Sequence, residues 1–219
     1  MFTGSSPFSD FVDTTFLTIV GISSLVLLGL LVAMVYFLFR YSRKKNPHPT
    51  NIEGNIPLEV AWTVIPLILF MGMFYMGWEG YSRMSTIPDD AVPIAVTARM
   101  WTWTFQYPNG LQTDTLFVPV RQAVKLTLTS MDVNHSMYIP AFRIKKDVIP
   151  NRTNVMWFST PEPKSYDIAC AEYCGLRHAY MYTKVVAMTP EAFDQWYRDR
   201  SAKNAKPYAP FQQTQSVSR

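Results

Sequence analysis

Residues Phe16 to Phe39 read FLTIVGISSLVLLGLLVAMVYFLF and include no charged side chain. A helix needs about 20 apolar residues to cross the hydrocarbon core of a membrane, so this run predicts a transmembrane helix at 16–39. A second run, VAWTVIPLILFMGMFYMGW from Val60, predicts another at 59–81. A cleavable signal peptide would begin with basic residues, whereas none precedes Arg40. The alternative for either run is a buried helix of a soluble protein.

The charges beside the two runs predict how the hairpin is oriented. The connecting segment 40–58 carries four basic residues and one acid, whereas segment 1–15 carries Asp10 and Asp13 and no basic residue. Loops rich in Lys and Arg stay on the cytoplasmic side of the membrane. We therefore expect a cytoplasmic loop, with the N-terminus and the C-terminal domain in the periplasm of a bacterial inner membrane or in the equivalent compartment of an organelle.

The composition of the whole chain excludes several classes of protein. Its 219 residues have a mean hydropathy of +0.01, a net charge of +4 and two cysteines. Two cysteines are too few for a disulfide-dense scaffold, a four-cysteine zinc site or a cysteine-ligated iron–sulfur cluster. The basic residues do not gather in one patch, so no nucleic-acid partner is expected.

Alternating residues predict that segment 89–200 is a domain of short β-strands. In VKLTLT, residues 124–129, every second side chain is apolar, which is the period of a half-buried strand. A turn at Pro108-Asn109-Gly110 follows the first such stretch. The other stretches lie at 94–103, 116–120, 153–158 and 183–188. We expect an all-β domain, either a Greek-key sandwich or a barrel.

The last part of the chain carries a helix signal followed by a polar segment. Thr189 suits the capping position, and Pro190 suits the first position of a helix. The aromatic residues expected on one side of this helix are Phe193, Trp196 and Tyr197. Segment 201–219 is polar and is predicted to be a flexible tail.

One segment of the outer domain concentrates metal-binding side chains. Cys170-Ala-Glu172-Tyr-Cys174-Gly-Leu-Arg-His178-Ala-Tyr-Met181 places two thiols, a carboxylate, an imidazole and a thioether close together. Sulfur with imidazole selects copper, and Cys and His with a weak Met ligand hold electron-transfer copper. Cys174, His178 and Met181 with an upstream histidine would suffice for one copper. Cys170 is therefore surplus to a mononuclear site.

The second thiol indicates a binuclear site. Two thiolates can bridge two copper ions and spread one electron over both, and each copper then needs a terminal imidazole. Of the three histidines, His48 lies in the predicted cytoplasmic loop, which leaves His135 beside His178. An ordinary disulfide and a zinc site are the alternatives, although Met181 is a poor zinc ligand.

On these residues, from Phe16 to about Tyr197, the chain resembles subunit II of the haem–copper cytochrome c oxidases, and its C-x-E-x-C-x3-H-x2-M run is highly specific. The resemblance implies a two-helix transmembrane hairpin followed by a cupredoxin domain with a CuA centre. In that centre the cysteines bridge two coppers, the histidines cap them, the methionine is a weak ligand and the glutamate binds through its carbonyl oxygen. The implied ligands are His135, Cys170, Glu172, Cys174, His178 and Met181.

Other positions take roles from the same resemblance. The Glu172 side chain would bind magnesium at the contact with subunit I, or else be a solvated acid. Trp101 would receive the electron from the donor, whereas Trp103 could equally belong to the core. Glu59 would lie at the mouth of a proton channel into subunit I, or else be an acid stabilised by the helix dipole. Asp132 matches an acidic position near the donor surface.

The implied function is that of an oxidoreductase subunit. It would accept electrons from a cytochrome c-type donor at CuA and pass them to haem in subunit I, where oxygen is reduced to water and protons are pumped. The chain has no C-x-x-C-H motif, so the haem would belong to a partner subunit. The alternatives are the CuA subunit of a haem–copper nitric oxide reductase and a membrane-tethered copper carrier or chaperone.

The charge of the outer domain bears on the donor. Between Trp101 and His135 the acids Asp114 and Asp132 are offset by two basic residues, and residues 89–219 hold 15 basic and 11 acidic side chains. Such a domain would not strongly steer a basic cytochrome. We expect a donor that is acidic, weakly charged or membrane-tethered.

Overall fold

The computed structural model describes residues 5–48, 50–51 and 53–203 and divides them into two units. One unit is the helical hairpin, residues 10–83. The other combines the described residues up to Ser9 with those from Met84 onward.

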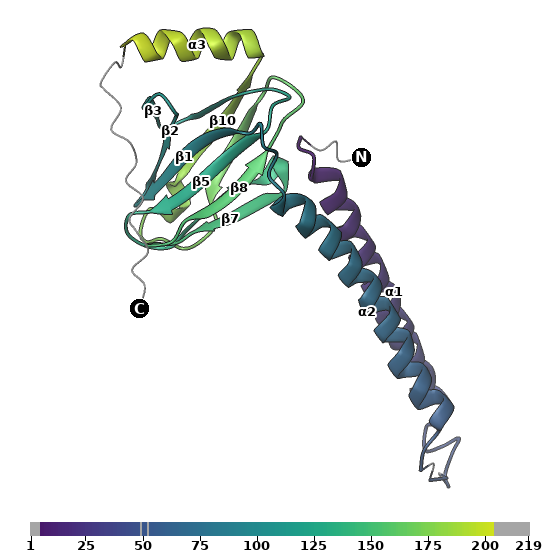
Figure 1. The fold of residues 1–219 in the computed structure, drawn as a ribbon. Coiled ribbons are helices and arrows are strands. Elements are labelled where there is room, and N and C mark those ends of the chain that lie inside the picture. The colour runs from purple at the N-terminus through teal and green to yellow at the C-terminus, as the bar shows by residue number, and fades with distance from the viewer. Residues whose placement is uncertain (1–4, 49, 52, 204–219) are drawn as a thin grey trace, which may run out of the picture. The chain divides into compact units, whose positions relative to one another are not determined.

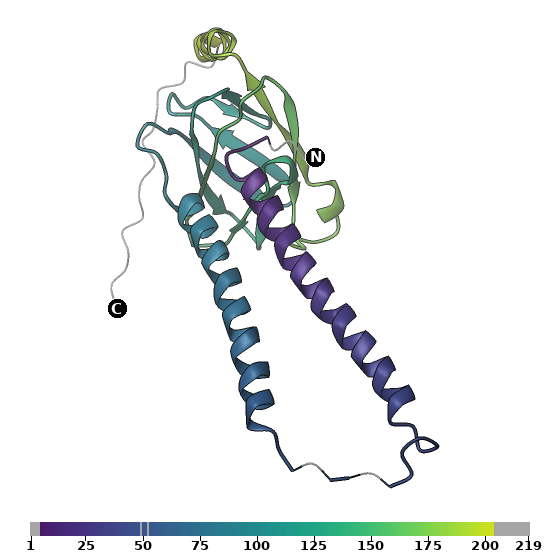
Figure 2. The same cartoon turned by 90° about the vertical axis from the view of Figure 1, so that its right-hand side faces the viewer.

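The hairpin consists of α1 (Ser9–Arg40) and α2 (Ile56–Ser85), joined at one end by a loop (Figure 2). Both helices are long and apolar enough to cross a membrane, and α2 continues through Pro66. The Phe11 ring lies where a side chain at position 80 would be, so Gly80 allows the helices to approach closely.

Each helix extends beyond the apolar run that predicted it. The α2 helix begins before Glu59 because Asn55 caps it: the Asn55 side chain accepts a hydrogen bond from Leu58 N–H over 3.1 Å. The α1 helix begins at Ser9, and the negative charge of Asp10 in its first turn interacts favourably with the positive end of the helix dipole. A run of apolar residues marks only the part of a helix that is suited to the hydrocarbon core of a membrane, and not the polar turns at its ends.

The outer domain is a sandwich of two five-stranded sheets (Figure 1). The first sheet has the order β3-β2-β1-β5-β8, and the second has the order β4-β10-β9-β6-β7. The pairs β1/β5 and β4/β10 are parallel, and the other pairs are antiparallel. The strands are β1 (Val92–Arg99), β2 (Thr102–Gln106), β3 (Gln112–Thr113), β4 (Leu116–Pro119), β5 (Val124–Ser130), β6 (His135–Ile139), β7 (Ile144–Val148), β8 (Asn154–Phe158), β9 (Ser165–Cys170) and β10 (Tyr182–Met188).

The core between the sheets follows the alternation of the strands. In β5, Val124, Leu126 and Leu128 are fully buried, whereas the residues between them are half-buried. The same pattern buries Ile94 and Val96 of β1. The predicted fold class, two apolar helices followed by a β-sandwich, is confirmed.

The stretch 94–103, predicted as a single strand followed by the turn at 108–110, contains parts of two strands. β1 and β2 pair antiparallel with Arg99 opposite Thr102, so Met100 and Trp101 form the tip of a hairpin. Because apolar residues lie on both sides of this tip, the alternation of apolar and polar residues does not show where the chain reverses direction. This correction places Trp101 in a loop.

The predicted C-terminal helix is α3 (Pro190–Lys203). As expected, Thr189 caps it, because its Oγ1 accepts a hydrogen bond from Ala192 N–H over 3.3 Å. The Trp196 ring stacks on Phe117, 4.5 Å between ring centroids. The helix runs three residues into the segment predicted to be a flexible tail, and residues 204–219 lie outside the described part of the chain.

The residues just before the first long helix belong to the outer domain. Phe8 is buried, and its ring meets Trp157 of β8 edge-on with 4.9 Å between centroids. The Ser6 hydroxyl donates to the carbonyl oxygen of Phe142 in the short helix η1 (Pro140–Phe142) over 2.8 Å. This segment therefore packs as part of the sandwich.

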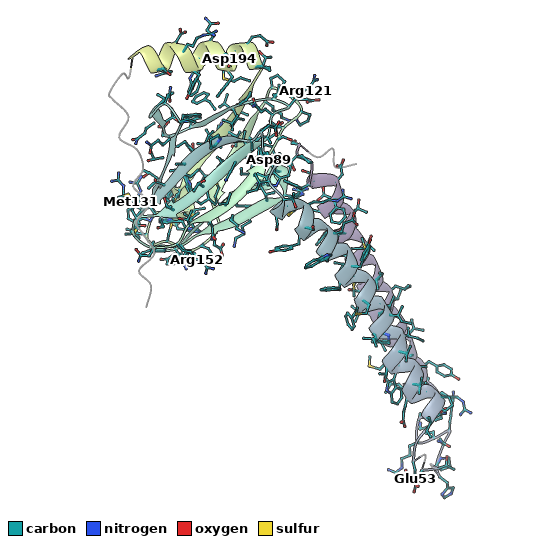
Figure 3. The ribbon with its side chains drawn as sticks, viewed as in Figure 1. Glu53, Asp89, Arg121, Met131, Arg152 and Asp194 are labelled. Carbon is teal, nitrogen blue, oxygen red and sulfur yellow. The ribbon has the colours of Figure 1, made fainter. Side chains whose placement is uncertain are left out.

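The two ends of the sandwich differ. Figure 1 shows α3 lying across one end. Figure 3 shows Met131, from the loop after β5, at the end opposite Asp194 of α3. The Met131 N–H donates to Ala98 O over 3.0 Å, which ties that loop to the end of β1.

Candidate metal centre

Strand geometry brings Cys170 and His135 together. Cys170 ends β9 and is buried by the same alternation that buries Tyr166 and Ile168. His135 begins β6 and is fully buried. β6 and β9 pair antiparallel with Met137 opposite Cys170, and the Ala171 N–H donates to Ser136 O over 2.9 Å. The predicted upstream histidine therefore meets the first cysteine.

The segment between β9 and β10 folds back so that its remaining donors reach the same place. Cys170 N–H donates to Met181 O, and His178 N–H donates to Gly175 O, each over 3.1 Å. The short helix η2 (His178–Tyr180) directly precedes Met181. Gly175 has φ of +114°, a conformation that residues with a Cβ rarely adopt. The donor side chains that are spaced along the sequence motif thus lie together in one cluster.

The nitrogen and sulfur atoms of this cluster form a chain. His135 Nδ1 lies 3.8 Å from Cys170 Sγ, which lies 3.8 Å from Cys174 Sγ. Cys174 Sγ lies 3.5 Å from His178 Nδ1. The ligand atoms of His135 and the two cysteines all lie within 4.8 Å of one another, and His178 joins them through Cys174. The order is imidazole, thiol, thiol, imidazole.

Two weaker donors lie beside the thiols. Met181 Sδ lies 3.7 Å from Cys174 Sγ, and Met181 is fully buried. The carbonyl oxygen of Glu172 lies 3.3 Å from Cys170 Sγ. The structure therefore brings together all six residues predicted as copper ligands, with one weak donor at each cysteine.

The two cysteines are free and buried. Burial, and secondly the neighbouring Cys170, raise the pKa of the Cys174 thiol to about 12. Two adjacent thiolates in this setting would repel each other unless a cation bound both. The Cys174 thiol is therefore protonated below this pKa unless a bound metal takes the place of its proton.

Asp132 has a role that sequence analysis missed. Its Oδ1 accepts a hydrogen bond from His135 Nε2 over 2.8 Å, and its Oδ2 accepts one from Met100 N–H over 2.7 Å. Although burial alone would raise it, hydrogen bonds from Met100, His135 and Val133 hold the pKa of Asp132 below its usual value. The D-x-x-H spacing was the available signal, because metal-binding histidines commonly donate their second N–H to a carboxylate.

The two tryptophans of the predicted aromatic segment differ in environment. Trp101 is half-buried, and its ring lies beside Gly175, next to Cys174: a Cβ at position 175 would be 3.5 Å from Trp101 Cζ2. Trp103 is buried in the core, with its ring edge-on to His135 at 6.2 Å between centroids. The open alternative for Trp103 is thus settled in favour of the core.

The Glu172 carboxylate points to a basic partner. It accepts a hydrogen bond from Lys145 Nζ over 2.9 Å, and Lys145 also bonds Asp147 over 2.9 Å. The hydrogen bonds that Lys145 donates to Glu172 and Asp147 raise the pKa of Lys145, and Lys145 lowers the pKa of Asp147. Glu172 therefore has its carbonyl beside the thiols and its carboxylate in an ion-pair network.

Glu59 and His48 belong to the hairpin unit. Glu59 Oε1 accepts a hydrogen bond from Asn55 N–H over 3.4 Å, while the Asn55 side chain caps the helix. This reciprocal arrangement resembles a capping box. The contacts of Glu59 within this unit are thus those of an acid at a helix start.

The donor set fits copper. Metal–ligand bonds of about 2.0–2.3 Å place neighbouring ligand atoms of a tetrahedral site about 3.3–3.8 Å apart. The contacts within the cluster span 3.3–3.8 Å. Thiolate, imidazole and thioether are the ligands that electron-transfer copper uses.

A sandwich of this topology with a soft-metal site at one end defines a cupredoxin-like domain, here joined to a membrane anchor. Two family models match the chain: the transmembrane domain of cytochrome c oxidase subunit II at residues 3–76, and the periplasmic domain of the same subunit at 109–188. Together they cover more than half of the sequence. The chain belongs to the cytochrome c oxidase subunit II family and is a membrane protein with an extracytoplasmic domain.

Individual relatives agree with this assignment. Cytochrome c oxidase subunit 2 of Alkalihalophilus pseudofirmus is 32% identical over 201 residues, which cover 86% of this chain and 59% of the relative. The Cereibacter sphaeroides protein of the same name is 28% identical over 203 residues, covering 74% and 67%. The chain thus spans about three fifths to two thirds of these relatives.

A solved structure also resembles the outer domain. The crystal structure of the periplasmic domain of subunit II of cytochrome oxidase from Bradyrhizobium japonicum has a TM-score of 0.51 and 27% sequence identity with this chain. The match covers 54% of this chain and 99% of that domain. The resemblance is therefore to the sandwich as a complete domain.

Proposed function

We propose that this chain is the electron-accepting subunit of a haem–copper oxidase and that its outer domain holds a binuclear CuA centre. The order imidazole, thiol, thiol, imidazole carries this proposal, because a single copper needs one thiol whereas two coppers can share both. Such a centre supplies one-electron storage, since an added electron is spread over two metals.

The residues around the site have distinct roles in this proposal. Cys170 and Cys174 would be shared by both coppers, and His135 and His178 would each hold one of them. Both cysteines are buried, and the strands β6 and β9 fix the first cysteine against His135. A buried site on rigid strands changes little when its charge changes, which suits rapid electron transfer.

We propose that Trp101 receives the electron. Its half-buried ring lies beside Gly175, one residue from Cys174. Tryptophan is enriched at the centres of protein interfaces, so the residue can serve both docking and transfer. The half-burial supports a fixed orientation of the ring.

The surroundings of Trp101 support a donor that is not strongly basic. The Asp132 carboxylate is 19% exposed and is used in internal hydrogen bonds. It is therefore a poor steering group for a cationic partner, which leaves an acidic, weakly charged or membrane-tethered cytochrome as the donor. Reduction rates that fall steeply with added salt, when a strongly basic cytochrome c is the donor, would contradict this.

Partner subunits complete the proposed activity. Electrons pass from this chain to haem in subunit I, where oxygen is reduced to water and protons are pumped. The loop that carries the ligands exposes large side chains, Tyr173, Leu176 and Tyr180, at 81%, 88% and 78%. Exposed apolar side chains that gather on one loop support a contact with another protein.

Three finer assignments belong to the same proposal. Glu59 supplies protons to subunit I, and the Glu172 carboxylate, now bonded to Lys145, takes part in a magnesium site at the subunit interface. The domain lies in the periplasm of a bacterial inner membrane. Neither a nitric oxide reductase subunit nor a copper carrier is favoured, because the relatives are oxidase subunits.

Copper content tests the proposal. The full chain, purified in detergent and loaded with copper under reducing conditions, is expected to retain two coppers per chain after a chelating column. The Cys170→Ser variant is expected to retain no more than one, because only one thiolate remains. One copper per chain in the unmodified protein would contradict the proposal.

A further inference from the structure

The carboxylate of Asp132 connects two parts of the site that are far apart in sequence. Asp132 Oδ2 accepts the Met100 N–H over 2.7 Å, and Asp132 Oδ1 accepts the His135 Nε2–H over 2.8 Å. Met100 lies immediately before Trp101, at the tip of the hairpin between β1 and β2. One side chain therefore contacts both the hairpin that carries Trp101 and a copper ligand.

The loop that carries Asp132 is itself held in place. Val133 N–H donates to Asp132 Oδ1 over 2.7 Å, and the Ser130 hydroxyl donates to Val133 O over 2.6 Å. Met131 N–H donates to Ala98 O, at the end of the strand that leads into the hairpin. The carboxylate thus projects from a loop fixed at several points.

The contact with His135 fixes the orientation of the imidazole. His135 Nδ1 faces Cys170 Sγ at 3.8 Å, so the ring proton belongs on Nε2, where Asp132 accepts it. A carboxylate hydrogen-bonded to the second nitrogen fixes the tautomer of a metal-binding histidine and makes it a stronger ligand. The His135 side chain is fully buried, so no solvent competes for this proton.

The chemistry of both contacts requires a carboxylate. Each partner is an N–H donor, and an ionised carboxylate has two accepting oxygens and no donor. An asparagine at position 132 would turn its NH2 group towards one of the two donors and leave that N–H unpaired. Charge-assisted bonds of this kind are also stronger than neutral ones.

We propose that Asp132 is a positioning residue that joins the Trp101 hairpin and the ligand His135 into one hydrogen-bonded unit. This inference rests on the proposed copper site. It gives an internal role to an acid that the sequence placed only near the donor surface, because this carboxylate accepts hydrogen bonds from the N–H groups of Met100, His135 and Val133.

Two measurements on the full chain in detergent test the role of Asp132. The first is the midpoint potential of the copper-loaded Asp132→Asn variant. It is measured by optical redox titration, and an absorption spectrum of the loaded protein is recorded beside it. Loss of the negative charge weakens the imidazole as a ligand and disfavours the oxidised metal, so the potential should shift to a more positive value. The second is hydrogen exchange at the Met100 amide, which should become about tenfold faster or more when its acceptor is lost.

The matched control is Asp114→Asn, the same chemical change at an acid that lines a cavity with Trp196 and Arg200 beside α3. It should leave both quantities at the values of the unmodified protein. An unchanged potential together with unchanged Met100 exchange in Asp132→Asn would overturn the inference.

A measurement on the unmodified chain covers the case in which the variant does not fold. The hydrogen-exchange rate of the Met100 amide should be lower by about tenfold or more than the rate in an unstructured peptide, although Met100 lies in an exposed hairpin tip. Exchange at the peptide rate would overturn the inference. The copper content of the unmodified protein separately reports on the proposed function, so the two failures are distinguishable.

Discussion

The sulfur atoms of Cys170 and Cys174 lie 3.8 Å apart, and both thiols are free. A disulfide would bring them to about 2.05 Å. Each sulfur instead has its own imidazole neighbour, His135 for the first and His178 for the second. The pair is therefore arranged as two metal ligands, and the disulfide alternative does not describe this structure.

Copper uptake is expected to depend on pH. The Cys174 thiol, whose pKa is raised to about 12, must lose its proton when the sulfur binds a metal. Metal binding therefore releases this proton at every pH below the pKa, and the apparent affinity rises about tenfold per pH unit for each proton released. Chelator competition between about pH 7 and pH 9 measures the slope, and an affinity independent of pH would contradict this assignment.

Replacing Trp101 by Phe should slow electron acceptance and leave the copper spectrum unchanged. The substitution replaces the indole by a smaller ring, which removes the indole from its place beside Gly175 and from the docking surface. Stopped-flow mixing of the assembled complex with a reduced cytochrome c should show a rate lower by about tenfold or more, since truncating a tryptophan at an interface hot spot costs about 2 kcal/mol or more of binding free energy. Trp196→Phe on α3 is the control and should react at the unmodified rate. Equal rates for both variants would exclude Trp101 as the acceptor.

The Glu59→Gln variant separates the two roles considered for this residue. Glutamine can still accept the hydrogen bond from Asn55 N–H, so the start of α2 should be preserved, whereas the ionisable group is lost. Oxygen consumption by the assembled complex should fall while the copper spectrum stays the same. Glu53→Gln in the preceding loop controls for the charge change. Full turnover in Glu59→Gln would leave Glu59 only its capping role.

The Gly175→Ala variant should destabilise the outer domain. Gly175 has φ of +114°, and an alanine Cβ there would meet the Trp101 ring at 3.5 Å. Backbone strain of this kind costs about 1–3 kcal/mol. Denaturant unfolding followed by near-ultraviolet circular dichroism should show the loss, whereas Gly72→Ala, which points into open space in α2, should unfold like the unmodified chain. Equal stability of the two variants would mean that position 175 tolerates a side chain.

Much of the fold and most of the donor cluster could be predicted from the sequence because both follow local periodicity and composition, whereas the binding of Glu172 through its carbonyl oxygen rests only on the family resemblance. The absence of charge in 16–39 predicts a membrane helix, and the alternation in 124–129 predicts a buried strand. The soft donors between Cys170 and Met181 predict copper. Each of these signals lies within a short window.

The features that escaped prediction depend on contacts between distant segments. The hairpin tip at Met100 and Trp101 is defined by the pairing of β1 with β2, not by a turn motif. The Asp132 carboxylate reaches Met100, 32 positions earlier in the chain. A single sequence carries no direct record of such tertiary hydrogen bonds.

Electron paramagnetic resonance of the copper-loaded full chain distinguishes a mixed-valence pair of coppers, bridged by Cys170 and Cys174, from a single copper. We expect a seven-line hyperfine pattern that integrates to about one unpaired electron per two coppers, because one electron is shared by two equivalent nuclei. A four-line pattern, the signature of one copper, would contradict the bridging role of Cys170.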